Sequence, residues 1–269
     1  MKRLLISAIL ACSFSLPALA DDALKAAIAG THRSADNHAR DAARHPYETL
    51  TFFGIKPNMT VVELSPGGGW YTEILAPYLR DQGTLIAAGG DPESTSEYAR
   101  KGAERLRQKL DATPAVFSKV QVGVFEAGNK YNFAAPNSVD LVVTFRNVHN
   151  WAPGGDAQLV TAFKAVYDSL KPGGVFGVVD HRLPEGKPAN PKSGYVHESY
   201  VIGLAQKAGF TLAEKSEINA NPKDTADHKN GVWALPPALA NKDEDRAKYV
   251  AIGESDRMTL KFVKPAAQK

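Results

Sequence analysis

The sequence predicts an α/β domain in which helices cover both faces of a doubly wound, mostly parallel β-sheet. From residue 60 on, strand-like and helix-like segments alternate, which is typical of parallel sheets. Two strand-like segments, residues 141–143 and 175–179, are continuously apolar, as expected of strands covered on both faces. A length of 269 residues with 43% hydrophobic residues suits one such domain with additions.

The hydrophobic pattern and the turn residues give the order of the elements. Residues 23–53 are expected to form two or three short helices, with Ser34 as the N-cap of an alanine-rich helix that stops at Pro46. Strands are expected at residues 60–64, 84–88, 116–125, 139–145, 175–179, 211–216 and 258–263. Further helices are expected from the glycine loop after residue 64 to about residue 79, and at residues 95–110, 157–170 and 198–208.

The first twenty residues have the order of a secretory signal peptide. Lys2 and Arg3 precede an apolar run at residues 4–16, and Ala18-Leu19-Ala20 provides small residues for cleavage after Ala20. The run is too short to span a bilayer permanently, so no stable membrane insertion is expected after cleavage. A buried N-terminal helix and a lipoprotein cleaved before Cys12 are the alternatives. We therefore expect export, to a bacterial periplasm.

The composition after cleavage limits the compartment and the partners. The remaining 249 residues contain no cysteine, which suits an oxidising compartment. Without Lys2 and Arg3, the 32 basic side chains become 30, against 29 acidic ones, so the net charge is +1. A chain so close to neutral is a poor binder of polyanions, and nucleic acid is set aside as a partner.

A glycine cluster, Gly67-Gly68-Gly69, follows the first expected strand and precedes its helix. Such a loop lets a ligand approach the backbone, and the helix N-terminus offers free N–H groups to an anion. The dinucleotide fingerprint needs a third glycine at position 72, which is threonine, so a nicotinamide enzyme is disfavoured. No Gly-Lys-Ser/Thr follows, and the loop is therefore not a phosphate-binding P-loop.

Two motifs carry a resemblance to a known family. Residues Glu63 to Gly69, together with Lys171-Pro172-Gly173-Gly174 before the fifth strand, resemble a class I S-adenosylmethionine-dependent methyltransferase. The longer pattern over most of residues 30–265 resembles a group of exported methyltransferases and includes Thr49-Leu50, Phe52-Phe53-Gly54, Val62-Glu63 and Pro66-Gly67-Gly68-Gly69-Trp70-Tyr71-Thr72-Glu73-Ile74-Leu75.

This resemblance implies a Rossmann-like, seven-stranded sheet of order 3-2-1-4-5-7-6 with the last strand antiparallel. Residues 21–56 would form an N-terminal helical lid, and residues 57–269 the α/β domain. A long insertion at about residues 217–256 would close the other side and influence substrate choice. Because a connection of that length inside a compact domain is usually functional or a cap, the residue pattern agrees with this division.

The resemblance also implies S-adenosylmethionine as cofactor and assigns residues to it. Glu63 would bind the ammonium of its methionine end, while Gly67, Gly68 and Gly69 would let that end lie against the backbone. Asp91, at the end of the second strand, would accept the two ribose hydroxyls. Glu126, after the third strand, matches the acidic position that reads the adenine amino group.

Each acidic residue has a structural alternative. Asp91 is also placed to cap a helix that starts at Pro92, and Glu126 to be a solvated turn residue. Glu63 lies in a buried strand, where an acid needs a partner, and a structural ion pair is the alternative there.

Polar side chains follow the fourth and fifth expected strands, which are neighbours in the implied order. Asn147 and His149 come after the fourth strand, and His181 after the fifth. Ligands bind beyond the carboxyl ends of parallel strands, so these residues are the catalytic candidates. His149 is the first choice for a general base, Asn147 or Asn150 would orient an acceptor oxygen, and structural roles for both histidines stay open.

Two other groups of polar residues need an interpretation. No metal is expected, since the spacing of an established metal site is lacking in the set His149, Asp180, His181, His197, Asp227 and His228. Arg33, Arg40, Asp41, Arg44 and His45 form a charged stripe in the N-terminal helices. This stripe is expected to be either a solvated, salt-bridged face or part of a lid over the cofactor.

The leading functional hypothesis is an exported methyltransferase that acts on a small molecule. Because S-adenosylmethionine is made where ATP is, a non-catalytic periplasmic ligand-binding protein on the same scaffold is the second hypothesis. A hydrolase is disfavoured, since the sequence contains no Gly-x-Ser-x-Gly motif.

Overall fold

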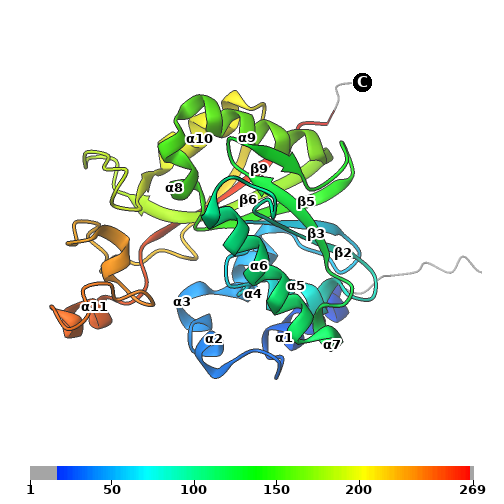
Figure 1. Cartoon of the computed structure of the whole chain (residues 1–269), viewed down its shortest axis with the longest axis horizontal. Coiled ribbons are helices and arrows are strands. Elements are labelled where there is room, and N and C mark those ends of the chain that lie inside the picture. Colours follow the sequence, from blue (N-terminus) through cyan, green and yellow to red (C-terminus); the bar gives the residue numbers. More distant parts are fainter. Residues whose placement is uncertain (1–16, 267–269) are drawn as a thin grey trace, which may run out of the picture.

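The computed structural model describes residues 17–266 (Figure 1). The strands are β1 (Thr60–Leu64), β2 (Thr84–Gly89), β3 (Gln121–Glu126), β4 (Lys130–Asn132), β5 (Val139–Phe145), β6 (Leu170–Leu183), β7 (Val196–His197), β8 (Thr211–Ser216) and β9 (Arg257–Val263). The α-helices are α1 (Pro17–Ile28), α2 (Ala35–Ala39), α3 (Asp41–Arg44), α4 (Pro46–Phe53), α5 (Thr72–Leu79), α6 (Glu97–Ala112), α7 (Pro114–Phe117), α8 (Val148–Trp151), α9 (Asp156–Ser169), α10 (Glu198–Lys207) and α11 (Arg246–Ile252). The 3₁₀ helices are η1 (Ala152–Gly154) and η2 (Gly231–Ala234).

The strands form one sheet of order β4-β3-β2-β1-β5-β6-β9-β8. The seven expected strands correspond to β1, β2, β3, β5, β6, β8 and β9, so the expected order 3-2-1-4-5-7-6 is confirmed. The last strand, β9, runs antiparallel to both β6 and β8. Two short strands were not expected: β4 extends the sheet beyond β3, and β7 pairs with β6, which gives nine strands rather than seven.

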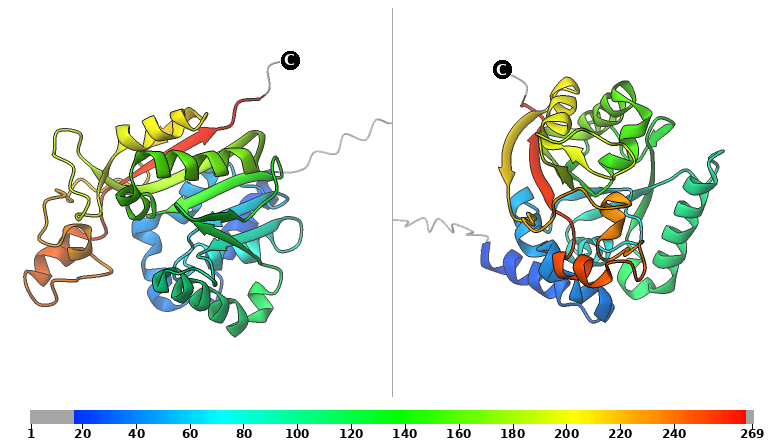
Figure 2. Two further views of the ribbon diagram at one scale, coloured as in Figure 1. Left: turned by 45° about the horizontal axis from the view of Figure 1, so that its top comes forward. Right: turned by 90° about the vertical axis from the view of Figure 1, so that its left-hand side faces the viewer.

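Helices cover both faces of the sheet, as expected of a doubly wound fold (Figures 1 and 2). Side chains alternate across each strand, so Val62 of β1 faces one core while Val61 faces the other. The first core contains Phe163 of α9 and Leu204 of α10. The second core contains Leu50 of α4, and with it residues of α1, α5 and α6. Burial on both faces explains the continuous apolar runs in β5 and β6.

The N-terminal helices differ in detail from the expectation. Ser34 is the N-cap of α2, since its Oγ accepts a hydrogen bond from Asn37 N, as predicted. The helical run is broken into shorter pieces, and His45 adopts a left-handed conformation with φ 42°. The helical segment does end before Pro46, as predicted, since α3 stops at Arg44 with His45 as its C-cap. Pro46 also begins a further helix, α4, because proline at the first helical position has no N–H to leave unpaired.

The third strand was expected to begin near residue 116 and in fact begins at Gln121. Pro114 starts the short helix α7 instead, and the N–H groups of Val116 and Phe117 bond to Thr113 O. Apolar periodicity does not distinguish a short helix from the beginning of a strand, whereas proline at a helix N-terminus does.

The predicted signal peptide lies largely outside the described residues. Of residues 1–20, only residues 17–20 are described; they begin α1, which continues past Ala20 without a break. Cleavage after Ala20 stays a prediction. Within residues 17–266, no helix is long and apolar enough to cross a membrane.

The insertion at residues 217–256 contains a small core of its own, formed by Ala234, Leu235 and Tyr249. Its Ala226 and Val232 form a second cluster with Leu183 and Tyr195, which precede the insertion. Its α11 segment lies beyond the body of the sheet (Figure 2). The end of the insertion contacts the N-terminal helices, because Arg40 Nε donates to Glu254 Oε1 at 3.0 Å. Two segments more than 200 residues apart in the sequence therefore meet over the carboxyl ends of β5 and β6.

Candidate active site

A cavity of about 310 Å³ lies at the carboxyl ends of β1, β2, β3 and β5. Its walls are the loop after β1, the end of β2, one face of α6, the end of β3 and the segment around α8. Open α/β sheets bind ligands at this edge, where the strand order reverses. The lining residues are Ser65, Pro66, Gly67, Gly89, Gly90, Ser96, Tyr98, Ala99, Gly102, Arg105, Leu106, Phe125, Glu126, Ala127, Asn147, Asn150, Trp151 and Gln158.

The three glycines of the loop have different environments. Gly67 lines the cavity with φ 59°, and a Cβ atom there would meet nothing within 4 Å. Gly68 is equally open but does not line the cavity. Gly69 has φ 73°, and a Cβ atom would lie 2.5 Å from Lys109 Cε, so glycine there lets α6 pack against the loop. Binding of the cofactor by these glycines stays a prediction.

A second, small cavity of about 20 Å³ adjoins the first and shares Ser65, Pro66 and Asn147 with it. Glu63, Trp70, Tyr71 and Arg146 are among its other lining residues. Tyr71 stacks on Phe145 at 3.4 Å between ring centroids, which closes one side.

Glu63 is an acidic residue in the middle of the sheet and is 2% exposed. Its Oε2 accepts a hydrogen bond of 2.6 Å from Thr72 Oγ1, whereas its Oε1 accepts none from the described residues. Burial raises the pKa of Glu63 to about 7, against the smaller opposing effects of Thr72, Lys109 and Arg146. The structural ion pair is not formed, since no Lys or Arg of residues 17–266 lies within 4.0 Å of this carboxyl group.

Glu126 lines the large cavity, as the resemblance implied for a residue that reads adenine. Its Oε1 accepts a hydrogen bond from Ser94 Oγ at 2.7 Å, and its Oε2 accepts the Asp91 N–H at 3.3 Å. These bonds hold the carboxylate at the end of β3 and leave it capacity to accept more donors.

Asp91 does not line the cavity. Its Oδ2 is bound by Lys130 Nζ at 2.8 Å, and Lys130 lowers the pKa of the carboxyl group. No helix starts at Pro92, because Ser96 caps α6, but Asp91 Oδ1 accepts the Glu93 N–H at 3.0 Å and so caps the turn that follows β2. Binding of ribose by Asp91 stays a prediction that requires the Lys130 contact to be shared or exchanged.

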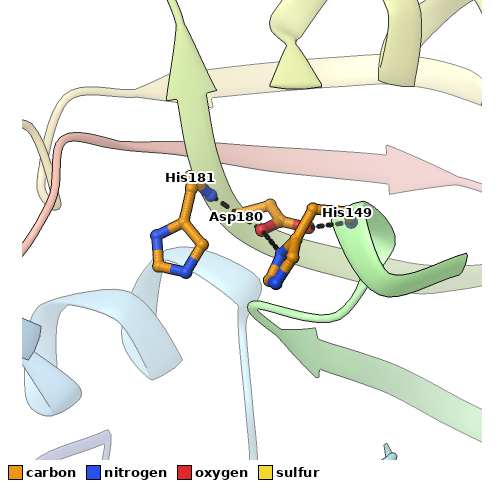
Figure 3. A group of neighbouring side chains, drawn as sticks. All are labelled: His149, Asp180 and His181. Carbon is orange, nitrogen blue, oxygen red and sulfur yellow. Dashed lines mark hydrogen bonds and ion pairs between the residues drawn. The ribbon is translucent and has the colours of Figure 1, made fainter. Parts of the chain in front are cut away.

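His149 and His181 meet at the ends of β5 and β6, on either side of Asp180 (Figure 3). Their ring centroids are 4.9 Å apart. The buried Asp180 accepts three hydrogen bonds: from His149 N at 3.0 Å, from His181 N at 2.7 Å, and at 2.8 Å from His149 Nδ1. A proton on His149 Nδ1 leaves Nε2 with a free lone pair, the arrangement of a general base.

His181 is the second histidine of this group. Its Nδ1 lies 2.6 Å from Ser255 Oγ. Burial, followed by the charges of His149, Arg146 and Arg257, lowers the pKa of His181 well below its usual value, so the ring is neutral at pH 7. The sequence placed both histidines together but did not reveal Asp180 or Ser255 as their partners.

Asn147 ties the end of β5 to the glycine loop. Its Nδ2 donates to Leu64 O and Ser65 O, each at 3.2 Å, and to Thr144 Oγ1 at 3.0 Å. The amide oxygen accepts nothing from the described residues and belongs to a side chain that lines both cavities. Asn147 therefore has an oxygen with which to orient a ligand.

The charged stripe of the N-terminal helices is not a solvated face. Arg33 and Arg44 are buried, and each lies over the Trp70 ring at 4.9 and 4.8 Å. Arg33 pairs with Asp41 at 2.7 Å. The predicted salt bridges of the stripe are formed, but the solvated face is wrong for Arg33 and Arg44, which pack on the loop after β1. The lid stays a prediction.

Arg146 is a site residue that the sequence reasoning missed. It immediately follows β5 and lines the small cavity, in a left-handed conformation with φ 61°. Its position after a buried strand is the same signal that selected Asn147 and His149. Nothing in the local sequence, however, predicts the unusual backbone conformation.

No protein-family model and no curated protein matches the sequence. Solved structures do match. A SAM-dependent methyltransferase from Aquifex aeolicus has 16% identity and a TM-score of 0.54, over 84% of this chain and 93% of that one. The cyclopropane synthase MmaA2 from Mycobacterium tuberculosis has 16% identity and a TM-score of 0.54, over 82% and 83%. The cyclase SpnF has 14% identity and a TM-score of 0.54, over 92% and 93%.

The chain has the class I methyltransferase fold. The sheet order and the antiparallel β9 agree with this similarity over most of the chain. Since a methyltransferase, a cyclopropane synthase and a cyclase share the class I methyltransferase fold, the fold by itself does not determine the reaction. The reaction has to be argued from the two cavities and their side chains.

Proposed function

We propose that the protein is an S-adenosylmethionine-dependent methyltransferase that acts on a small molecule. The observation that carries the proposal is the cavity of about 310 Å³ at the edge of a class I methyltransferase sheet, open to Gly67 and Glu126. The residues fit the cofactor: the free Oε1 of Glu63 suits an ammonium group, and the Glu126 carboxylate suits hydrogen-bond donors of an adenosyl group.

When bound, the cofactor supplies an electrophilic methyl group, to which an acceptor's lone pair bonds while the S–C electron pair returns to sulfur. The chain's own residues position the reactants and exclude water. His149 Nε2 accepts the acceptor's proton where one has to leave, and Asp180 stabilises the resulting imidazolium through Nδ1. Asn147 Oδ1 orients a donor group of the acceptor. Trp70 and Tyr71 line the small cavity and are held there, the Trp70 ring against Arg33 and Arg44 and the Tyr71 ring stacked on Phe145.

A steric block tests this assignment of the large cavity. Gly102 lines it from within α6, and a Cβ atom there would meet only Arg105 Nη2, at 3.9 Å. Leucine at this position fits the helix and is expected to fill the cavity, so Gly102→Leu should weaken binding of S-adenosylmethionine and S-adenosylhomocysteine at least about tenfold. Isothermal titration calorimetry measures both affinities.

The matched control is Gly203→Leu. Gly203 also lies inside a helix, α10, and a Cβ atom there would meet nothing within 4 Å, but it does not line the cavity. This variant should bind like the wild type. Absence of binding by the wild type, or equal binding by the two variants, would contradict the proposed cofactor site.

A non-catalytic ligand-binding protein is the second candidate. Asp91, the residue expected to bind ribose, is engaged by Lys130 and lies outside the cavity lining. If the wild type fails to bind either adenosyl compound, a different ligand of the same cavity becomes the better explanation.

We also propose that the chain is exported to the periplasm. The support is the charged, apolar and small-residue order of residues 1–20. An alkaline phosphatase fusion to residues 1–30 is expected to be active, because that enzyme requires an oxidising compartment for its disulfides. An inactive fusion would contradict export and would place the protein where S-adenosylmethionine is made.

A further inference from the structure

Four guanidinium groups surround one buried carboxylate beside the small cavity. Glu254 pairs with Arg40 Nε at 3.0 Å, Arg44 Nε at 3.1 Å, Arg257 Nη1 at 2.8 Å and Arg146 Nη1 at 3.8 Å. Among residues 17–266, no other carboxylate lies within 4.0 Å of these four side chains. The group, which we call the arginine cluster, therefore carries three positive charges in excess.

Several donors of the arginine cluster have no acceptor. Arg44 and Arg257 are 2% and 3% exposed, and Arg44 Nη1 and Arg257 Nε make no hydrogen bond. The Arg146 guanidinium also donates to no described residue, and its only ion-pair partner is the distant Glu254 oxygen. A buried N–H group without an acceptor is unfavourable, and an anionic ligand would supply the missing acceptors.

Arg146 connects the arginine cluster to the candidate active site. Its side chain is 25% exposed and lines the small cavity with Glu63, Tyr71 and Asn147. A left-handed backbone is unfavourable for arginine, and here it is held by the Arg146 N–H, which donates to Val179 O at 2.7 Å. Arg146 and Arg257 both act on the charge of His181, which lies beside the candidate base.

A metal ion is a weaker candidate for this region. His149, Asp180 and His181 have ligand atoms within 4.8 Å of one another. Asp180, however, already accepts three hydrogen bonds from the two histidines, and the excess positive charge of the arginine cluster repels a cation. The same charge attracts an anion.

We propose that the methyl acceptor carries an anionic group, a carboxylate or a phosphate, which binds to Arg146 where that side chain lines the small cavity, with the charges of the buried Arg44 and Arg257 behind it. This inference rests on the proposed function. Guanidinium groups bind both anions through pairs of parallel hydrogen bonds. The anionic group anchors the acceptor and is not the atom that is methylated, because pairing with a guanidinium group makes it a poor nucleophile. The methylated atom lies on the His149 side.

Small probes test the anion site without requiring turnover. The full chain, saturated with S-adenosylhomocysteine, is titrated with trifluoroacetate and with its neutral counterpart trifluoroacetamide, observed by ¹⁹F NMR. Inorganic phosphate is observed by ³¹P NMR. Saturable binding of trifluoroacetate or phosphate, but not of the amide, is expected, and the tighter of the two anions identifies the preferred group. Equal binding of acid and amide would overturn the proposal.

Arg146→Gln should weaken binding of the anion at least about tenfold, since it removes the charge that lines the cavity. Arg40→Gln, at the partly exposed edge of the arginine cluster, is a second variant in case the first folds poorly. Arg107→Gln removes an exposed charge from α6 and should leave the affinity unchanged. If Arg146→Gln and Arg107→Gln lose the same affinity for the anion, the loss comes from the overall charge of the protein rather than from a specific site. That result would overturn the proposal.

The cofactor has a carboxylate of its own, and the same variants distinguish the two sources. If the arginine cluster binds the acceptor, Arg146→Gln should bind S-adenosylhomocysteine like the wild type. Arg146→Gln could instead weaken the binding of S-adenosylhomocysteine but not of 5′-methylthioadenosine, which lacks the amino-acid end. In that case the arginines bind the cofactor and the proposal fails. If neither adenosyl compound binds the wild type while the anions still do, the proposed function fails and the anion site stands.

Discussion

Replacing Glu254 by glutamine is expected to lower the free energy of unfolding by about 3–5 kcal/mol. The carboxylate is the one acidic partner of four arginines within the described part of the chain, and it is buried with Arg44 and Arg257. Its removal leaves four positive charges close together in a region of low polarity. Urea denaturation at pH 7, compared with the wild type, measures the loss.

The control for this variant is Glu217→Gln. Glu217 also binds an arginine through both oxygens, Arg182 at 2.8 and 2.7 Å, but its side chain is 67% exposed. A surface pair of this kind contributes less than about 1 kcal/mol. Phosphate should restore part of the stability of Glu254→Gln beyond what chloride does at equal ionic strength. Similar losses in the two variants would contradict the importance assigned to burial.

Replacing Glu63 by glutamine is expected to stabilise the unliganded protein at neutral pH and to weaken the binding of the cofactor. The pKa of Glu63 is about 7 in the folded chain and 4.5 as a free side chain. Below pH 4.5 the group is protonated in both states and has no effect. Between pH 4.5 and 7 the unfolded chain loses the proton first, so the folded state loses relative stability as pH rises. At about 1.4 kcal/mol per pKa unit, the cost above pH 7 is about 3 kcal/mol.

Glu63→Gln removes this titration and keeps the acceptor for Thr72 Oγ1. Its free energy of unfolding minus that of the wild type should therefore increase by about 3 kcal/mol from pH 4.5 to pH 7.5, as measured by urea denaturation at several pH values. A difference that does not change with pH would show that Glu63 is not the titrating group. In calorimetry, the variant should lose affinity for S-adenosylmethionine but keep its affinity for 5′-methylthioadenosine, which lacks the ammonium.

Glu185→Gln provides a control of opposite sign. Hydrogen bonds from Ser199 lower the pKa of Glu185, so its carboxylate stabilises the folded state above pH 4.5 and this contribution is lost as pH falls. This variant should be less stable than the wild type at neutral pH, with the difference vanishing in acid. The pair of variants therefore separates the effect of burial from a general effect of removing a carboxylate.

Local patterns predicted most of the sheet because each strand contains its own signal. The strands at residues 60–64, 139–145 and 211–216 have the predicted bounds. Predictions failed where two structures share one apolar pattern, as at Pro114, or where a strand is only two or three residues long, as in β4 and β7. Strands that short have too few residues for a period to show.

The candidate site likewise contains residues that the sequence predicted correctly and residues whose role it could not predict. The rule that ligands bind after parallel strands selected Asn147, His149 and His181. The structure brings the two histidines together with Asp180, whereas Asn147 lines both cavities and the histidines line neither. The same rule selected Asp91, which Lys130 engages outside the cavity lining. Whether a carboxylate is free to bind a ligand depends on which side chain folds against it, and that partner lies 39 residues further along the chain.

The sequence by itself determined the class of the fold and placed Gly67, Glu63 and Glu126 at the edge of the sheet where the two cavities lie, because these features follow from residues close together in the chain. Only the tertiary structure decided that Arg44 and Glu254, 210 residues apart, form a buried group with Arg146 and Arg257. The net charge of the sequence does not show this arrangement. The near-neutral chain conceals a concentrated positive site, since charge acts through distance and burial rather than through composition.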